Sequence, residues 1–335
     1  MKAIGFRRPL PITEPEALVE VELPRPVPGP RDLLVRVAAV SVNPVDTKVR
    51  RSADPGGEVR VLGFDAAGVV EAVGAEVTLF RPGEAVFYAG AIDRAGSNAE
   101  HQLVDERIVG AKPRSLDFAA AAALPLTSLT AWEMLFDRLA IRRDASAGRT
   151  LLIIGAAGGV GSMAVQLARR LTDLTVIGTA SRPETAAWVR ELGAHHTLDH
   201  GRPMPPQLQE LGIAGVDYLF STTMTDRHFP AIVEMMAPQG RFGLIDDPET
   251  IDVRLLKRKS VSLHWELMFT RSLFQTPDMA RQHEILDEVA RLVDDGTLRT
   301  TLAEQLGRID AENLTRAHAM VESGRTRGKI VLAGF

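Results

Sequence analysis

Short apolar runs separated by glycines and prolines fill the first third of the chain. Residues 34–40 partly alternate between apolar and polar positions, and valine-rich runs follow at 69–73 and 86–87. Runs of this length with turn residues between them are typical of β-strands. The pattern predicts a small β-barrel rather than a helical domain.

From residue 150 the pattern changes to apolar strands that alternate with helical periodicity. The predicted strands are 151–154, 174–177, 197–199, 216–220 and 241–245, and the predicted helices are 160–171, 184–192 and 229–236. This alternation indicates βαβ units and a parallel sheet. The short, continuous apolar runs fit strands that are buried on both faces.

The segments on either side of this region complete the picture of a two-domain chain. An alanine run at 119–123 stops at Pro125, where we place a domain boundary, and residues 127–139 have helical apolar spacing. Pro277 is expected as the first residue of a late helix, and residues 328–333 are expected as a final strand. A length of 335 residues is sufficient for two domains.

Charge narrows the possible partners. The chain has 39 Lys plus Arg and 43 Asp plus Glu, so its formal net charge is −4. No long basic block is present, which argues against nucleic acid or an anionic membrane as a partner. The N-terminus lacks the apolar core of a signal peptide, so we expect a cytoplasmic protein.

The chain contains no cysteine. This excludes disulfides, thiolate nucleophiles, iron–sulfur clusters and every zinc site that needs cysteine. A zinc site built from histidine and carboxylate ligands is possible in principle, but the eight histidines show no local ligand spacing. We therefore expect no metal.

The segment 155–161, with the sequence GAAGGVG, lies between a predicted strand and a predicted helix. In the dinucleotide-binding pattern G-x-G-x-x-G, Ala156 takes the place of the first glycine, and Gly158 and Gly161 are the second and third. A bare backbone at Gly158 admits a pyrophosphate, and the helix N-terminus offers N–H groups to it. The alternative is a glycine-rich tight turn. We assign cofactor binding to Gly158, Gly159, Val160 and Gly161.

The end of the next predicted strand indicates the form of the cofactor. An NAD site normally has an acidic residue there, but residues 179–182 are Thr-Ala-Ser-Arg. Arg182 has a planar donor array suited to a phosphate, so NADPH is favoured over NADH, with Ser181 and Arg182 as binding residues. We expect His200 beside the adenosine. The alternatives are a solvated arginine before Pro183 and a plain surface histidine.

Six motifs that occur together span nearly the whole chain. They are VNPVD at 42–46, GFDAAGVV at 63–70, PGE at 82–84, LTAW at 129–132, the phosphate loop, and GKIV at 328–331. The combination resembles the medium-chain dehydrogenase/reductase superfamily, in particular its zinc-free quinone oxidoreductase branch and the related group labelled zinc-binding alcohol dehydrogenase family protein.

The resemblance implies an α/β fold class with two domains. A GroES-like β-barrel domain is expected from residues 1–124 and 272–335, and a Rossmann domain with a doubly wound parallel sheet from residues 125–271. The active site is expected in the cleft between them. The resemblance also implies that Thr130 lies near the nicotinamide, with a buried helical threonine bonded to its own backbone as the alternative.

The same resemblance shows a departure from the zinc-using relatives. Their catalytic metal ligands would fall at Asn43 and in segment 63–65, which is Gly-Phe-Asp here, and the cysteine-rich structural zinc lobe is missing. Without a Lewis acid, alcohol oxidation is difficult because nothing stabilises an alkoxide. A quinone or an α,β-unsaturated carbonyl is already electron-poor, so we expect NADPH to reduce such an acceptor directly.

Three residues are candidates for catalysis. Asn43 is the leading donor to a developing oxyanion, because the resemblance implies that segment 43–46 lies in the cleft; a turn residue before Pro44 is the alternative. Tyr88 can donate a proton or a hydrogen bond, or can pack as an aromatic at a barrel edge. Asp46 can orient a partner or cap the next segment.

The resemblance also implies a homodimer joined through the sheet edge near residues 261–269. Trp265 is an aromatic residue of this apolar segment, so we expect it in the core or in the interface, with a place in the wall of the pocket as the alternative. Two other functions stay open. One is an alkenal or enone double-bond reductase without quinone activity, and the other is an NADPH-binding regulatory or structural protein without turnover. The sequence does not separate them, because pocket shape decides the first and the phosphate loop serves the second equally well.

Overall fold

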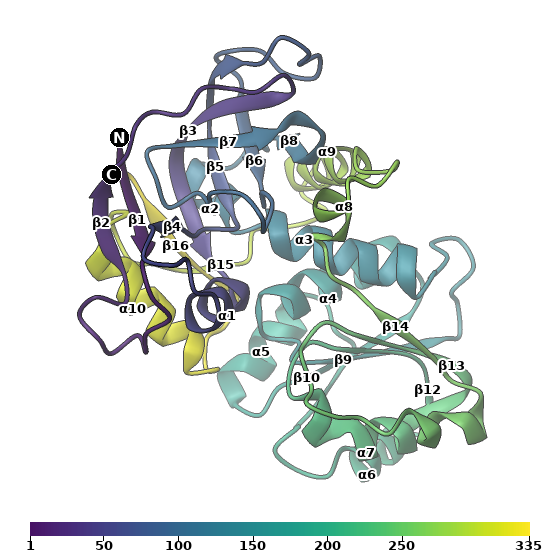
Figure 1. Cartoon of the computed structure of the whole chain (residues 1–335). Coiled ribbons are helices and arrows are strands. Elements are labelled where there is room, and N and C mark those ends of the chain that lie inside the picture. The colour runs from purple at the N-terminus through teal and green to yellow at the C-terminus, as the bar shows by residue number, and fades with distance from the viewer. The chain divides into compact units, whose positions relative to one another are not determined.

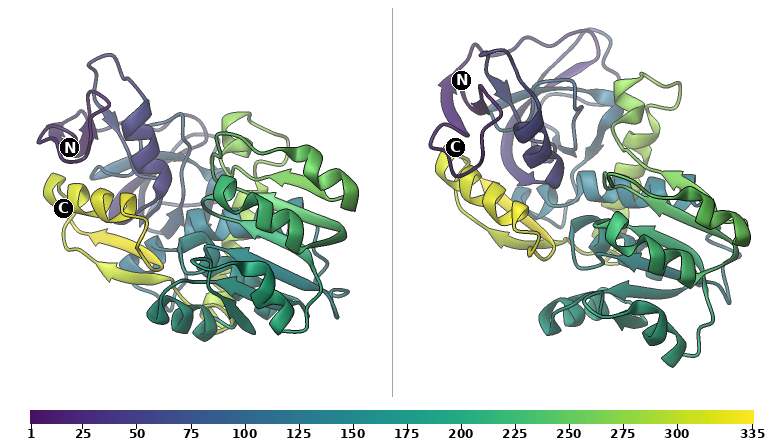
Figure 2. Two further views of the ribbon diagram at one scale, coloured as in Figure 1. Left: turned by 90° about the horizontal axis from the view of Figure 1, so that it is seen from below. Right: turned by 60° about the horizontal axis from the view of Figure 1, so that its bottom comes forward.

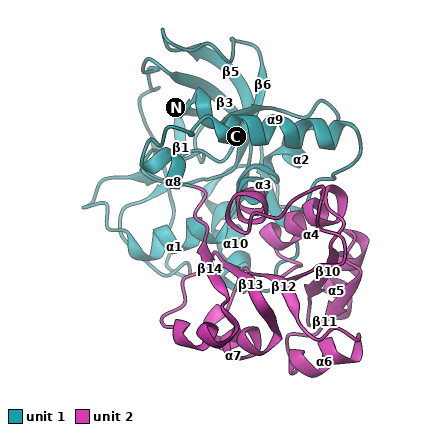
Figure 3. Cartoon of the chain, turned by 90° about the vertical axis from the view of Figure 1, so that its right-hand side faces the viewer, with its two compact units in different colours: residues 1–129, 269–335 teal, residues 130–268 magenta.

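The computed structural model covers residues 1–335 and divides into two compact units (Figure 1, Figure 3). Unit 1 comprises residues 1–129 and 269–335, and unit 2 comprises residues 130–268. Unit 1 therefore contains both ends of the chain, and the two termini lie close together in each view (Figure 2).

Unit 1 is built on a mostly antiparallel sheet, as the first third of the sequence predicts. Its seven strands have the order β15-β16-β3-β5-β6-β8, with β7 paired to β3. The predicted final strand, β16, pairs with β3 and sets Val331 opposite Ser41, so the end of the chain completes the sheet. The bounds are β3 (Asp32–Val42), β5 (Ala66–Val73), β6 (Ala85–Tyr88), β7 (His101–Asp105), β8 (Val109–Ala111), β15 (Leu302–Gln305) and β16 (Lys329–Ala333).

A smaller sheet of order β2-β1-β4 belongs to the same unit. Its strands are β1 (Lys2–Phe6), β2 (Val19–Glu22) and β4 (Arg60–Val61). The helices of unit 1 are α1 (Pro44–Ser52), α2 (Phe118–Ala122), α8 (Thr270–Leu273), α9 (Arg281–Asp294), α10 (Ala311–Glu322) and the short 3-10 helix η1 (Glu106–Ile108). Helix α3 (Pro125–Trp132) begins in unit 1 and ends in unit 2.

Helix α9 begins later than the sequence predicts. Pro277 is not its first residue, because residues 276–280 form a turn before the helix starts at Arg281. In this turn Thr276 Oγ1 donates to Asp278 Oδ1 at 2.7 Å, and the N–H of Arg281 donates to the Asp278 carbonyl at 2.9 Å. The predicted apolar face is confirmed and is buried at Ile285, Val289, Leu292 and Val293.

Unit 2 contains the predicted parallel sheet, and this confirms the α/β fold class. All six strands run parallel in the order β11-β10-β9-β12-β13-β14. They are β9 (Thr150–Ile154), β10 (Thr175–Thr179), β11 (His196–Leu198), β12 (Val216–Ser221), β13 (Met236–Leu244) and β14 (Ser262–Trp265).

Helices cover both faces of this sheet. Helices α4 and α5 lie on one face, and α6 and α7 lie on the other (Figure 1). The bounds are α4 (Gly159–Leu171), α5 (Pro183–Glu191), α6 (Met204–Glu210) and α7 (Thr225–Met235). A π-helix, η2 (Glu133–Arg138), continues α3, and a 3-10 helix, η3 (Val253–Lys259), precedes β14.

The strand order of unit 2 reverses at β9. The chain adds β10 and β11 on one side of β9, then returns and adds β12, β13 and β14 on the other. In open parallel sheets of this kind, ligands bind outside the carboxyl ends of the strands at the switch point. The residues that follow β9, β10 and β12 are therefore the expected place of a cofactor site.

The helical run Phe118–Arg138 has the length and apolar composition of a membrane span. However, 89% of its apolar window is buried inside the structure, as in the core helix of a soluble protein. It includes α2, α3 and η2, and it contains all of the predicted helical segment 127–139 except the last residue.

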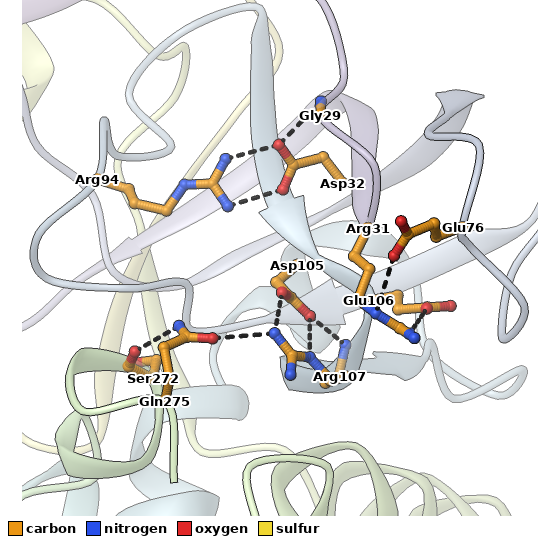
Figure 4. Close-up of polar contacts among 10 residues, drawn as sticks. All are labelled: Gly29, Arg31, Asp32, Glu76, Arg94, Asp105, Glu106, Arg107, Ser272 and Gln275. Carbon is orange, nitrogen blue, oxygen red and sulfur yellow. Dashed lines mark hydrogen bonds and ion pairs between the residues drawn. The ribbon is translucent and has the colours of Figure 1, made fainter. Parts of the chain in front are cut away.

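Ion pairs hold loops of unit 1 to its large sheet (Figure 4). Asp32, at the start of β3, accepts two hydrogen bonds from the Arg94 guanidinium, at 2.8 and 3.0 Å. The buried carboxylate of Glu106 accepts from Arg31 at 2.8 Å and from the backbone N–H groups of residues 78–79 at 2.7 Å each. Each buried carboxylate oxygen therefore has a partner, as burial of a charge requires.

Candidate functional site

The predicted phosphate loop lies at the switch point of unit 2. Strand β9 ends at Ile154, and α4 begins at Gly159 with Gly158 as its N-cap residue. No side chain caps this helix. The N–H groups of its first turn also have no partner within the helix, so they are suited to bind a phosphate together with the helix dipole.

Two glycines of the loop serve different purposes. A Cβ atom at Gly161 would lie 2.3 Å from the Gly155 carbonyl oxygen and 2.6 Å from Ala156 Cα, so the packing of helix on strand requires this glycine. A Cβ atom at Gly158 would meet only the Gly155 oxygen, at 3.5 Å, which is an ordinary contact. The packing of the chain does not explain Gly158, whereas the close approach of a pyrophosphate does. The loop therefore fits a dinucleotide.

Thr179, the last residue of β10, connects the loop to His200. Its Oγ1 accepts a hydrogen bond from the N–H of Gly155 at 3.1 Å and lies 3.0 Å from His200 Nδ1. The structure thus brings the first glycine of the loop and the predicted histidine to one side chain. His200 is half-buried and is not a plain surface histidine.

Ser181 and Arg182 follow β10, and Arg182 is the N-cap residue of α5. Ser181 is exposed, and Arg182 Nε lies 3.0 Å from Glu184 Oε1. The arginine is therefore already paired, which the sequence analysis did not foresee. Because the two side chains are 31% and 59% exposed, this is a surface ion pair of low strength.

A second group of polar side chains is buried in unit 1. Asn43, Asp65 and Lys329 are each at most 3% exposed. Lys329 Nζ lies 3.0 Å from Asp65 Oδ2 and donates to Asn43 Oδ1 and, at 3.0 Å, to the Val42 carbonyl. Asn43 Nδ2 donates to Asp65 Oδ2 at 2.8 Å. We call Asn43, Asp65 and Lys329 the Lys329 cluster.

Burial controls the electrostatics of this cluster. It raises the pKa of Asp65, while the Lys329 ammonium and hydrogen bonds from the Leu126 N–H and the Asn43 amide oppose the rise. The Leu126 N–H donates to Asp65 Oδ1 at 2.7 Å, so both carboxylate oxygens have donors. The carboxylate is therefore neutralised entirely by groups of unit 1.

Asp46 has the capping role that the sequence left open. Its Oδ2 accepts from the N–H of Asn43 at 2.8 Å, and its Oδ1 accepts from the N–H of Gly63 at 3.0 Å. Burial raises the pKa of Asp46 to about 7, against the opposing effect of these N–H groups and of Lys329. Asp46 therefore fixes the backbone on which Asn43 is carried.

The other predicted residues differ in whether their polar atoms have hydrogen-bond partners within the chain. Both polar atoms of the Asn43 amide have partners within unit 1. Tyr88, on β6, is fully buried, and its hydroxyl has no hydrogen-bond partner within the chain. Burial raises the pKa of Tyr88, so the phenol keeps its proton at neutral pH. Thr130 is buried in α3. The catalytic and nicotinamide roles of these residues stay predictions.

Sequence reasoning missed two partners of Asn43. Asp65 and Lys329 both lie inside motifs recorded at 63–70 and 328–331, but Lys329 is 286 positions from Asn43, and no local pattern joins them. His228 was also missed. Its ring centroid lies 6.0 Å from that of His200, a contact that depends on how α7 packs in unit 2.

Comparisons with known proteins agree with this geometry. The family described as alcohol dehydrogenase GroES-like domain matches residues 29–114, and the family described as zinc-binding dehydrogenase matches residues 192–332. A zinc-type alcohol dehydrogenase-like protein of Staphylococcus aureus is 42% identical over 99% of both chains. The chain belongs to the medium-chain dehydrogenase/reductase superfamily.

Within the superfamily the chain belongs to the quinone oxidoreductase-like branch. The quinone oxidoreductase of Pseudomonas aeruginosa is 32% identical over 95% of this chain and 96% of its own. A putative zinc-dependent alcohol dehydrogenase from Rhizobium etli is 58% identical, with a TM-score of 0.97 over 100% of this chain and 98% of its own. A mycobacterial protein solved with NADPH is 26% identical, with a TM-score of 0.84 over 99% and 100%. This member of the superfamily is an oxidoreductase with a pyridine nucleotide cofactor.

The zinc named in some of these descriptions does not fit the residues of this medium-chain dehydrogenase/reductase. No group of three or more histidine, cysteine, aspartate or glutamate side chains is arranged to hold a metal ion. Among the residues expected in place of the catalytic ligands, the Lys329 ammonium contacts both Asn43 and Asp65. A positive charge from the chain itself therefore neutralises the carboxylate.

Removing the charge of Lys329 should destabilise the protein. In Lys329→Met, Asp65 loses its counter-ion and stays buried, so we expect the free energy of unfolding in urea to fall by about 3–5 kcal/mol. The matched control is Lys257→Met, which removes an exposed lysine of η3 and should change the free energy by less than about 0.5 kcal/mol.

The double variant Lys329→Met/Asp65→Asn should recover part of this loss, because Asp65 no longer leaves a buried charge without its counter-ion. If Lys329→Met were as stable as the wild type, or if the double variant recovered nothing, Lys329 would not be the counter-ion of Asp65.

Proposed function

We propose that this protein reduces a quinone or an α,β-unsaturated carbonyl with NADPH, by direct hydride transfer and without a metal ion. The observation that carries the proposal is that the dinucleotide loop lies beside the end of β10, where residues 179–182 contain an arginine and no carboxylate. Arg182 follows β10, and His200 follows β11. The likeness to a quinone oxidoreductase and to a mycobacterial NADPH complex supports it.

Different residues of unit 2 would bind different parts of the coenzyme. The N-terminus of α4 would bind the pyrophosphate through the N–H groups of Gly159, Val160 and Gly161, and Gly158 would admit it to the backbone. Arg182 would exchange Glu184 for the 2′-phosphate, because a dianion binds the planar guanidinium more strongly than one exposed carboxylate does. Ser181 would add a hydroxyl donor.

The residues of unit 1 would serve the acceptor. NADPH, when bound, supplies the hydride. The protein then has to orient the acceptor, exclude water and stabilise the oxygen on which negative charge develops. We keep Tyr88 as the candidate hydrogen-bond or proton donor, because its hydroxyl has no partner within the chain and is protonated at neutral pH; since this hydroxyl is fully buried, the role requires that the acceptor displaces the groups that cover it. Asn43 holds Asp65 in the Lys329 cluster through its amide N–H, and Asp46 fixes the Asn43 backbone.

The coenzyme preference depends on Arg182. In Arg182→Ala we expect NADPH to bind about 10- to 100-fold more weakly, because the 2′-phosphate loses a bidentate partner, while NADH affinity changes by less than about twofold. Titration of the nicotinamide fluorescence measures both. Arg190→Ala on the same helix, whose guanidinium bonds to Thr197, is the control and should leave both affinities unchanged. Equal losses for the two coenzymes would refute the assignment.

The acceptor class is tested by mixing NADPH with benzoquinone, a naphthoquinone and a 2-alkenal and following the absorbance of NADPH. We expect oxidation with at least one quinone, because this acceptor needs no further activation. Oxidation by the alkenal alone would identify an enone reductase without quinone activity. No oxidation with any acceptor would favour a binding protein without turnover.

We also propose that two chains associate through β14. This strand pairs only with β13, so its other edge is open. The strand ends at Trp265 and is shorter than the predicted segment 261–269, because the next residue, Glu266, turns inward to pair with Arg138 at 2.7 Å. Trp265 and Leu267 are 53% and 51% exposed, so Trp265 is not a core residue. An open edge beside exposed apolar side chains favours association.

Light scattering after size exclusion should therefore give twice the mass of one chain for the wild type. Trp265→Glu places a charge in the interface and should shift the protein to the monomer. Leu211→Glu is the control, because Leu211 is a similarly exposed apolar residue, 37% accessible, at the end of α6. A monomeric wild type, or a Trp265→Glu protein that stays dimeric, would contradict this arrangement.

A further inference from the structure

Four basic side chains gather in unit 2 where β10, β11 and β12 are followed by their helices. They are Arg182, His200, Arg227 and His228, which we call the histidine–arginine cluster. The ring centroids of His200 and His228 are 6.0 Å apart, with the planes inclined at 60°. Arg182 and His200 are predicted from the sequence as cofactor ligands, whereas Arg227 and His228, in the first turn of α7, are not.

The cluster is joined to the phosphate loop by hydrogen bonds. The N–H of Gly155 donates to Thr179 Oγ1 at 3.1 Å, and Thr179 Oγ1 lies 3.0 Å from His200 Nδ1. When the Thr179 hydroxyl donates to Nδ1, the neutral imidazole of His200 carries its proton on Nε2. His200 is thus held in place by the same threonine that holds the loop.

The acidic groups that face the two histidines are largely occupied by other donors. Asp199, next to His200, accepts from the N–H of Gly201 at 2.8 Å. Asp226 and Asp246 both act on His228, but Asp226 accepts from the N–H of Arg227 at 2.8 Å, and Asp246 accepts from the N–H and hydroxyl of Thr225.

Both histidines are neutral near neutral pH in the protein without ligand. Burial lowers the pKa of His200, and Arg227 and Arg182 lower it further, against the effect of Asp199. Burial likewise lowers the pKa of His228, with His200 and Arg227 acting in the same direction and the two aspartates opposing it. His228 is only 7% exposed, so charging it without a counter-ion is costly.

We propose that this histidine pair is a proton-linked part of the coenzyme site: when a 2′-phosphate binds among Arg182, His200, Arg227 and His228, the pair takes up a proton. The proposal rests on the proposed function, since it needs a phosphorylated coenzyme. A phosphate dianion placed among the four side chains adds negative charge to that of Asp199, Asp226 and Asp246, and on our proposal it takes the place of Glu184 at Arg182. It therefore favours the imidazolium form that burial and the arginines otherwise oppose.

The sign of the proton transfer distinguishes the protein from the coenzyme. The 2′-phosphate has its own second pKa of about 6, and a cationic site lowers this value, so a bound phosphate can only release protons. Net proton uptake on binding must therefore come from the protein. A coenzyme without the 2′-phosphate should cause none.

The test is isothermal titration of the full-length protein with NADP⁺ and with NAD⁺, at about pH 7.5, in HEPES and in Tris. These buffers differ in ionisation enthalpy, so the difference in apparent binding enthalpy gives the number of protons exchanged. We expect uptake of about half a proton with NADP⁺ and less than about a tenth with NAD⁺.

Two variants locate the proton. His200→Gln and His228→Gln should each reduce the uptake with NADP⁺ by about half or more and weaken NADP⁺ about five- to tenfold, while NAD⁺ affinity changes by less than about twofold. His196→Gln, the same substitution on β11, is the control and should keep both the uptake and the affinity. Unchanged melting temperatures of the variants show that folding is intact.

The outcomes separate the two proposals. Equal affinity for NADP⁺ and NAD⁺ would overturn the coenzyme preference, and this inference with it. Tighter binding of NADP⁺ without proton uptake, or with uptake that persists in both His200→Gln and His228→Gln, would overturn the histidine inference alone and leave the coenzyme preference standing.

Discussion

A buried ammonium group is stable only when acceptors surround it, and Lys329 has three: the Val42 carbonyl, the Asn43 amide oxygen and the Asp65 carboxylate. These acceptors come from the end of β3, the start of α1 and the segment before β5, whereas Lys329 opens β16 near the end of the chain. The Lys329 cluster therefore ties the last strand to the first half of unit 1. It also gives Asp65 a permanent counter-ion, so this carboxylate needs no metal ion to be buried. Our proposal that the acceptor is already electron-poor rests on this absence of a role for a metal ion, since no Lewis acid is then available to activate it.

Unit 2 meets a different constraint, which is to hold an anion at the carboxyl edge of a parallel sheet. Gly161 is required by the packing of α4 on β9, while Gly158 leaves the backbone open to a pyrophosphate. Thr179 links this loop to His200, so the loop and the histidine that we predict beside the adenosine share one hydrogen-bonded group. Residues 179–182, at the end of β10, contain no carboxylate, whereas an NAD site normally has one at this edge.

Hydrophobic periodicity and local motifs predict most of the fold. The alternation of strands and helices from residue 150, the phosphate loop and the final strand are all found where the sequence predicts them, because neighbours in sequence set each of these features. The errors come from contacts that no local pattern records. The turn before Arg281 delays α9, and the inward pair of Glu266 shortens β14. The same holds for the candidate site. Its glycines and Arg182 can be found from local sequence motifs. The partners of Asn43 and the contact between His200 and His228 cannot, because they depend on the packing of segments that are distant in the sequence.

The claim that hydride passes directly to the acceptor without a metal is tested most directly by isotope transfer. Protein freed of metal by a chelator and checked by elemental analysis is mixed with a 2-alkenal and NADPH that carries deuterium at both positions of nicotinamide C4. We predict that NMR of the product shows one deuterium at the β-carbon, formed at the same rate as with untreated protein. Loss of turnover after zinc removal that returns when zinc is added, or a product without deuterium at that carbon, would contradict it.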